Sequence, residues 1–286
     1  MGITMANRKE YSNVVLKRLK EDMKERAKII AGMEKEVRLW AEQGKYVRIC
    51  GESFRPISVE PRFPLVGYGR NSVKKIDRVN ARFDLYKEKL KEVDGVKAER
   101  RLQSYIIREA MKNGRDLTRG LNISNTFDEL LFCLDEISLG DRNNKVQLEF
   151  DNETGIVRCD ILAVGKLKNS SDWRPVLLEL KYDRSMKRLN AQLKNFTSLF
   201  DTEEMRDALE DLIKTLIPKK IDKYDGTFIK GIVWPAPNNP EKITPLYSGL
   251  DDLIELVYNK PSTKEEAVRN DNWHIRLFDR SAKNDS

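Results

Sequence analysis

Histidine and cysteine, the residues that most often bind soft metals, are scarce in this chain. His274 is the single histidine among 286 residues, which excludes a zinc site built from several His ligands. The three cysteines, Cys50, Cys133 and Cys159, are odd in number and far apart, so no disulfide framework is indicated. Cys133 and Cys159 lie in apolar runs, where we expect small core residues. Any metal bound here should therefore be a hard cation held by carboxylates.

Long apolar runs and nucleotide-binding motifs are also missing. No run approaches the roughly 20 residues needed to span a bilayer, and the N-terminus lacks the apolar core of a signal peptide. The sequence contains no G-x-x-x-x-G-K-[ST], so no P-loop ATPase is expected. Hydrophobic residues make up 40% and charged residues 35% of the chain, which is typical of a globular protein with a charged surface. We therefore expect a cytoplasmic protein.

Positive charge is concentrated in the first third of the chain. Residues 1–100 contain 24 Lys and Arg against 15 Asp and Glu, whereas residues 101–286 contain 29 against 31. A basic region of this kind fits a polyanionic partner such as nucleic acid. Charge alone favours a solvated helical surface over such a partner.

The N-terminal third has helical periodicity in two stretches. Apolar residues recur every three or four positions over residues 7–43 and again over 73–93, and the Pro- and Gly-rich stretch 45–72 between them indicates loop or short strand. Asp94-Gly95 then breaks the pattern. We expect residues 1–95 to form a mainly helical region that either grips nucleic acid or forms a homodimer through its apolar seam.

Residues 96–286 alternate between strand-like and helix-like patterns, as expected for an α/β sandwich with a mixed sheet. The turn 151–155 predicts that the strands on either side of it form a hairpin. A helix over 97–113 should end before Gly114. The other predicted elements are strands at 130–139, 146–150, 156–164, 176–182, 228–234 and 273–278, and helices at 186–200, 203–216 and 250–257.

Charged residues interrupt two strands that otherwise look buried. Asp160 lies in the middle of the apolar run 156–164, and Glu179 and Lys181 share one face of the strand 176–182. A buried carboxylate needs a partner such as a metal or an ammonium group. Asp160, Glu179 and the Leu180 carbonyl could hold one Mg²⁺, and Lys181 could orient a metal-bound water. The alternative is a Glu–Lys ion pair at the end of a strand beside a surface acid.

These residues and two flanking helix motifs resemble the PD-(D/E)XK nuclease superfamily. Upstream, Glu99 and Gln103 lie one turn apart in a helix similar to the first core helix of the family. Downstream, Gln192-x-x-x-Phe196 resembles the Gln-x-x-x-Tyr motif of RecB-type and phage λ-type exonucleases. The sequence departs from the family at Cys159, where the family name has Pro, and at Phe196, which lacks the Tyr hydroxyl. The resemblance covers about residues 97–235.

The resemblance implies a restriction-endonuclease-like core, a Mg²⁺ or Mn²⁺ cofactor and roles for individual residues. Asp160 and Glu179 would bind the metal directly, and Glu99 would bind it through water or complete its shell. Lys181 would position the nucleophile. The two glutamines would contact the substrate, and Gln192 would also steady the active site. Two alternatives stay open: the Glu99 role could fall to Glu109, Glu129 or Glu136, and Gln103 and Gln192 could be ordinary exposed helix residues.

The function predicted from this pattern is a metal-dependent nuclease that hydrolyses phosphodiester bonds of DNA, as an endonuclease. The alternative is a non-cleaving nucleic-acid-binding or interaction protein that retains the nuclease fold. The sequence leaves open whether DNA or RNA is cut, whether the substrate is duplex or single strand, whether cleavage is internal or from ends, and which pathway uses it.

Overall fold

The computed structural model describes residues 13, 15–24, 27, 31, 34–42, 98–139, 157–185, 189–217, 220–237, 253–259 and 273–278. Several predictions from the sequence lie outside these residues. They are the loop at 45–72, the helix at 73–93, the boundary at Asp94-Gly95, and the strand at 146–150 with its turn at 151–155.

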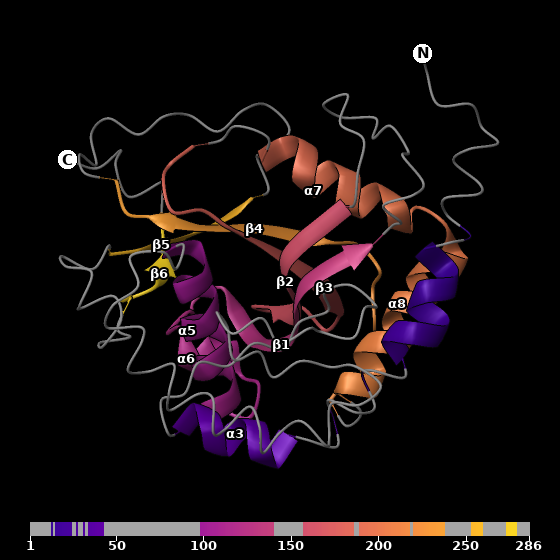
Figure 1. Cartoon of the computed structure of the whole chain (residues 1–286), viewed down its shortest axis with the longest axis horizontal. Coiled ribbons are helices and arrows are strands. Elements are labelled where there is room, and N and C mark those ends of the chain that lie inside the picture. The colour runs from indigo at the N-terminus through magenta and orange to yellow at the C-terminus, as the bar shows by residue number, and fades with distance from the viewer. Residues whose placement is uncertain are drawn as a thin grey trace, which may run out of the picture.

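A curled, mixed sheet of six strands forms the centre of the protein (Figure 1), which confirms the predicted α/β class. The strands stand side by side in chain order. β2 is antiparallel to both of its neighbours, β1 and β3. The strands β3, β4 and β5 are parallel, and β6 is antiparallel to β5. The strands are β1 (Phe127–Leu139), β2 (Val157–Leu167), β3 (Trp173–Leu180), β4 (Ile229–Pro235), β5 (Ile254–Tyr258) and β6 (Arg276–Leu277).

The helices lie close to where the sequence predicts them. α5 (Ala98–Lys112) ends two residues before Gly114, which adopts a positive φ of 62° that glycine tolerates without strain. α7 (Leu189–Thr197) continues into a short 3₁₀ turn and then α8 (Glu203–Leu216), and together they connect β3 to its parallel neighbour β4. The four-residue α6 (Leu117–Gly120) was not predicted. None of the described helices has the length and apolar character needed to cross a membrane.

The described part of the N-terminal region packs onto the sheet domain. A π-helical stretch, η1 (Arg18–Met23), runs beside α8, and α3 (Glu34–Glu42) packs against α5 (Figure 1). Val15, Leu19 and Ala27 are fully or almost fully buried in the same core cluster as the sheet residues. These residues of the apolar seam are therefore covered within one chain.

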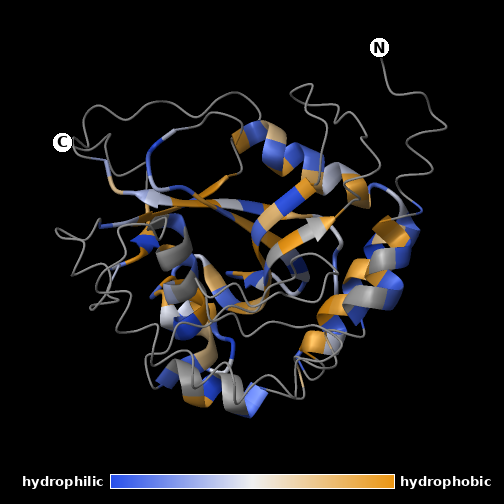
Figure 2. Cartoon of the chain, viewed as in Figure 1, coloured by the Kyte–Doolittle hydropathy of each residue, from blue (hydrophilic) through white to orange (hydrophobic). Residues whose placement is uncertain are grey.

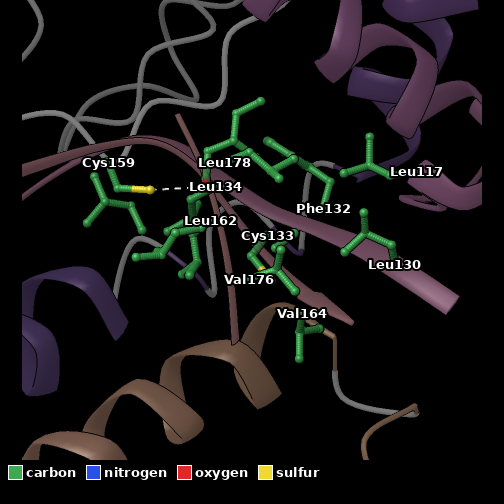
Figure 3. Close-up of a cluster of buried hydrophobic side chains, with 14 of the residues drawn as sticks. Leu117, Leu130, Phe132, Cys133, Leu134, Cys159, Leu162, Val164, Val176 and Leu178 are labelled. Atoms are coloured by element: carbon green, nitrogen blue, oxygen red, sulfur yellow. Dashed lines mark hydrogen bonds between the residues drawn. The ribbon is translucent and has the colours of Figure 1, made fainter. Parts of the chain in front are cut away.

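Apolar side chains from the first three strands are part of the hydrophobic core. Figure 3 shows Leu162, Val164 and Val176 gathered with both described cysteines. Figure 2 shows largely apolar strands interrupted by single polar positions, and helices with both apolar and polar residues. Cys133 and Cys159 are buried and free, which confirms them as core residues. Burial raises the pKa of the Cys133 thiol to about 12, so the thiol stays protonated at neutral pH.

The helix predicted at 250–257 is wrong, because residues 254–258 form strand β5. Apolar residues at 253, 254, 256 and 257 fit both periods, and periodicity alone cannot distinguish a short helix from a buried strand. The edge of β4 decides the outcome. It offers unpaired backbone groups that β5 satisfies over five parallel pairs, from Gly231↔Ile254 to Pro235↔Tyr258.

Candidate active site

The candidate site forms where β2 and β3 stop pairing. Their antiparallel ladder ends at Ile161↔Leu178, and the next residue on each strand beyond that pair is an acid, Asp160 or Glu179. The Leu180 amide, which faces β2, donates to Asp160 Oδ2 at 2.8 Å instead of to a backbone carbonyl. The end of the ladder thus brings two carboxylates side by side on neighbouring strands.

Lys181 lies next to these acids and has two side-chain partners. Its ammonium nitrogen donates to Glu179 Oε1 at 2.8 Å and to Gln192 Oε1 on α7 at 3.0 Å. Glu179 is 5% exposed, and only 16% of the Lys181 side chain reaches solvent. Glu179 on β3 and Gln192 on α7 together therefore hold the lysine side chain in place.

The main chain of Lys181 is fixed as well. Its amide donates to the Val233 carbonyl of β4 at 2.9 Å, and its carbonyl accepts from the Tyr258 hydroxyl of β5 at 3.0 Å. Four strands thus define the site, because β2 supplies Asp160, β3 supplies Glu179 and Lys181, and β4 and β5 anchor the backbone.

Helix α5 contributes Gln103 and Glu99. Gln103 is 3% exposed and donates from Nε2 to the main-chain carbonyl of Asp160 at 2.9 Å. This contact excludes the reading of Gln103 as an exposed helix residue. Glu99 lies one turn earlier, and its negative charge contributes to the raised pKa values of both Asp160 and Glu179. Its role toward a metal stays a prediction.

Burial and the neighbouring charged groups shift the pKa values of the site residues. Burial, and then the neighbouring Glu179, raise the pKa of Asp160 well above its usual value, although the Leu180 amide and Lys181 oppose the shift. Burial likewise raises the pKa of Glu179, although the charge and hydrogen bond of Lys181 and a hydrogen bond with the Asp160 side chain oppose the shift. For Lys181, burial is the largest single influence and lowers the pKa, but the attraction of Glu179, its hydrogen bond and the charges of Asp160 and Glu99 together outweigh it, so the net pKa is raised. Three acids therefore share one ammonium group, and burial raises the pKa of the two acids on β2 and β3.

This set of donors suits a hard divalent cation. The Leu180 amide and Lys181 use one oxygen of each carboxylate, and the two side chains are also hydrogen-bonded to each other. Mg²⁺ and Mn²⁺ prefer carboxylate oxygens as ligands. Across the part of the chain that the structure describes, no three His, Cys, Asp or Glu side chains gather into a metal-binding group. A metal here would therefore take further ligands from the Leu180 carbonyl and from water, with Glu99 acting through water.

Two of the competing acids, and Phe196, have other contacts. Glu109 pairs with Lys112 on α5 at 2.8 Å, and Glu129 lies opposite Lys166 in the β1–β2 ladder. The side chain of Glu136 lies outside the described residues. Phe196, one turn after Gln192, is buried, and its ring centre lies 5.5 Å from that of Phe200. A core position of this kind has no use for the tyrosine hydroxyl.

Four residues near the site were not predicted from the sequence. Tyr258 holds the Lys181 carbonyl, and Arg184, Trp234 and Glu255 form a bonded cluster beside it. Tyr258 and Glu255 were missed because their segment was predicted as a helix. A charged residue inside the apolar run 253–258 was the available signal, and it is the same signal that identified Asp160.

Comparisons of the chain with models of protein families, with curated proteins and with solved structures find no match. The resemblance to PD-(D/E)XK nucleases therefore depends on the motif residues and on the arrangement of the site. That arrangement brings Asp160, Glu179, Lys181 and Gln192 together and places Gln103 on the backbone of Asp160.

Proposed function

We propose that this protein is a metal-dependent nuclease that hydrolyses phosphodiester bonds of DNA, and that it cuts internally. One observation carries the proposal. Asp160 and Glu179 lie side by side at the open end of the β2–β3 ladder, and Lys181 donates to Glu179 at 2.8 Å. An isolated ion pair would not need a second carboxylate and a third acid, Glu99, in the same electrostatic environment.

Each residue has a definite task in the proposed reaction. Asp160, Glu179 and the Leu180 carbonyl would hold Mg²⁺ or Mn²⁺, with Glu99 reaching it through water. When bound, such a metal lowers the pKa of a coordinated water and stabilises charge on a phosphate oxygen. Lys181 would orient the attacking water and offset the negative charge that develops on the phosphate. Gln192 would hold the Lys181 ammonium group in place through the bond of 3.0 Å.

The order of elements supports the same proposal. Helix α5, the antiparallel strands β1 to β3, helix α7 and the parallel strand β4 follow one another along the chain. This is the helix–strands–helix–strand order that the resemblance implies for a restriction-endonuclease-like core. The basic excess within residues 1–100 supports a polyanionic substrate.

A direct assay tests the proposal. The purified full chain is incubated with supercoiled plasmid, linear duplex, single-stranded DNA and RNA, in Mg²⁺, Mn²⁺ or EDTA. We expect nicking or linearisation of plasmid with either metal and none in EDTA. A parallel preparation of Glu179→Ala controls for a contaminating nuclease, because it should copurify the same contaminants and cut nothing.

The assay also separates the subsidiary expectations. Cleavage of closed plasmid requires internal attack. Degradation of linear DNA alone would therefore indicate that the protein is an exonuclease and not an endonuclease. Cleavage of RNA alone would change the substrate class. Tight DNA binding without any cleavage, in every metal tested, would favour the non-cleaving binding protein instead.

A further inference from the structure

Arg184 is held rigidly three residues after Lys181. Its Nη1 donates to the Pro235 carbonyl at 2.8 Å, and its Nη2 donates to Glu255 Oε1 at 2.7 Å. The guanidinium carbon also lies 3.9 Å from the ring centre of Trp234 and 5.8 Å from that of Phe278. Contacts of this kind immobilise a side chain that is otherwise rich in rotamers.

The acceptor Glu255 lies in strand β5 and is buried. It is 3% exposed, and its Oε1 accepts a second hydrogen bond from the Trp234 indole at 2.6 Å. A buried carboxylate needs such partners, because an unpaired one costs several kcal/mol. Glu255 and Trp234 therefore fix the position of the guanidinium group.

The sheet places this cluster on the same face as the candidate active site. Glu179 is the partner of Ile232, and Ile232 is the partner of Glu255, in consecutive parallel ladders. Residues paired across neighbouring strands project from the same face. The carboxylate of Glu255 is thus on the face that carries Glu179 and Lys181.

The position of Arg184 along the sheet follows from β4. The Lys181 amide uses the Val233 carbonyl, and the Arg184 guanidinium uses the Pro235 carbonyl two residues later. The guanidinium thus replaces the amide that β3 would have supplied if the strand had continued. Two residues of strand correspond to roughly 7 Å, so the charge of Arg184 is held about that far beyond the anchor of Lys181.

The guanidinium keeps binding capacity after these contacts. Two of its five N–H groups donate to Pro235 and Glu255. Within the described residues no further hydrogen-bond partner is recorded for it, and 23% of the side chain reaches solvent. A pre-oriented guanidinium with free N–H groups matches the oxygen pattern of a phosphate.

We propose that Arg184 binds a backbone phosphate of the nucleic acid next to the phosphate hydrolysed at Asp160, Glu179 and Lys181. The proposal rests on the proposed nuclease function and adds a second phosphate-binding position to it. Glu255 and Trp234 are positioning residues, which act by holding the guanidinium. The ligand is one phosphodiester group, so base identity does not enter the contact.

The double variant Arg184→Gln/Glu255→Gln tests the proposal in the full chain. It preserves the net charge and leaves no buried carboxylate unpaired, so the long-range attraction for DNA is unchanged. Binding of labelled duplex and single-stranded DNA is measured in EDTA across a range of salt concentrations. Loss of one phosphate contact should make the slope of log K against log salt shallower by about 0.9 for duplex, or about 0.7 for a single strand.

Kinetics and a matched control separate the contact from a structural role. In Mg²⁺ the double variant should raise KM and leave kcat close to the wild-type value, because the interaction is made in both ground and transition states. Lys168→Gln removes one exposed positive charge at the β2–β3 turn, eight residues along β2 from Asp160 and thus roughly 26 Å away. We expect its salt slope to match that of the wild type.

Each outcome decides the proposal. An unchanged slope and KM in a folded double variant would show that Arg184 only supports the fold. If the double variant does not fold, Arg184→Lys is tested in its place. Lysine keeps the positive charge but lacks the planar set of N–H donors that binds two phosphate oxygens at once. That variant should bind DNA more weakly at an unchanged slope, and wild-type affinity would overturn the proposal. A wild-type chain that neither binds nor cuts nucleic acid refutes the nuclease function itself, independently of Arg184.

Discussion

Two regions of the molecule contain lysine–carboxylate pairs of almost the same length in different surroundings. At the end of β3, Lys181 and Glu179 are 2.8 Å apart, with 16% and 6% of their side chains exposed. Between η1 and α8, Lys24 and Asp211 are also 2.8 Å apart, with 39% and 62% exposed. Lys20 and Glu204 repeat the second arrangement at 2.9 Å.

The comparison shows that burial, and not distance, distinguishes the two kinds of ion pair. Water screens the pairs on α8, which hold two helices together and contribute little. The pair at β3 is shielded from water and lies beside a second acid, Asp160, so its charges interact strongly with whatever enters the site. The η1–α8 pairs join two segments of the chain, whereas the buried pair at β3 is placed where it would interact with a ligand.

Removing an acid from the buried region should give the largest effect. Asp160→Ala or Glu179→Ala should reduce cleavage by about 10³-fold or more, because a lost metal ligand removes several kcal/mol of transition-state stabilisation. The matched substitution at the surface pair, Asp211→Ala, should leave cleavage unchanged. The rates are measured on plasmid in Mg²⁺, with circular dichroism to verify folding. Wild-type cleavage by a folded Asp160→Ala protein would refute the site.

The two lysines give the next largest contrast. Lys181→Ala should lower turnover by ~10²-fold or more and retain metal and nucleic-acid binding, because the ammonium group stabilises charge that develops during the reaction. Lys24→Ala should cut at the wild-type rate. Single-turnover kinetics and binding in EDTA separate the two effects. Equal losses of turnover in Lys181→Ala and Lys24→Ala would contradict the claim that only the buried lysine takes part in cleavage.

Stability should change in the opposite direction from activity at Asp160. In metal-free protein, Asp160→Asn removes repulsion from Glu179 and Glu99, and Asn can still accept the bond from the Leu180 amide. We expect a gain of about 1 kcal/mol in the free energy of unfolding, or roughly 2–4 °C in Tm. Mg²⁺ or Mn²⁺ should raise the Tm of the wild type and not that of the variant. Thermal melts with and without metal measure both effects, and a loss of stability would contradict the repulsion.

Breaking the surface pairs should have the smallest effect. Lys24→Gln should lower the free energy of unfolding by about 0.2–1 kcal/mol, and the loss should fade at high salt because water and ions screen exposed charges. Denaturant titrations at low and high salt measure this change. A salt-independent loss well above 1 kcal/mol would show that the contact of η1 with α8 is more buried than its charges suggest.

Local patterns predicted much of the fold and the candidate site. The bounds of α8 and the end of α5 before Gly114 follow from periodicity and helix-ending residues, which depend on neighbours in sequence. Glu179 and Lys181 share a face because side chains alternate along a strand. Their proximity to Asp160 was predicted because acids inside apolar strands are costly without a partner.

Long-range contacts account for what the sequence did not reveal. The same five residues, 254–258, could be helix or strand until the open edge of β4 provided a partner. The ion pair of Arg184 and Glu255 joins residues 71 positions apart, and Tyr258 reaches a carbonyl 77 positions away. Neither spacing has a local signature.

The sequence by itself determined the α/β class, the main helices and the three charged residues Asp160, Glu179 and Lys181 as the candidate site. Only the tertiary structure decided that β2 and β3 stop pairing at Ile161↔Leu178, which leaves the two carboxylates adjacent and shields them from water. The physical reason is that alternation and periodicity act between neighbours along the chain. The end of a ladder and the depth of a charge depend on strands and helices that approach from elsewhere in the sequence.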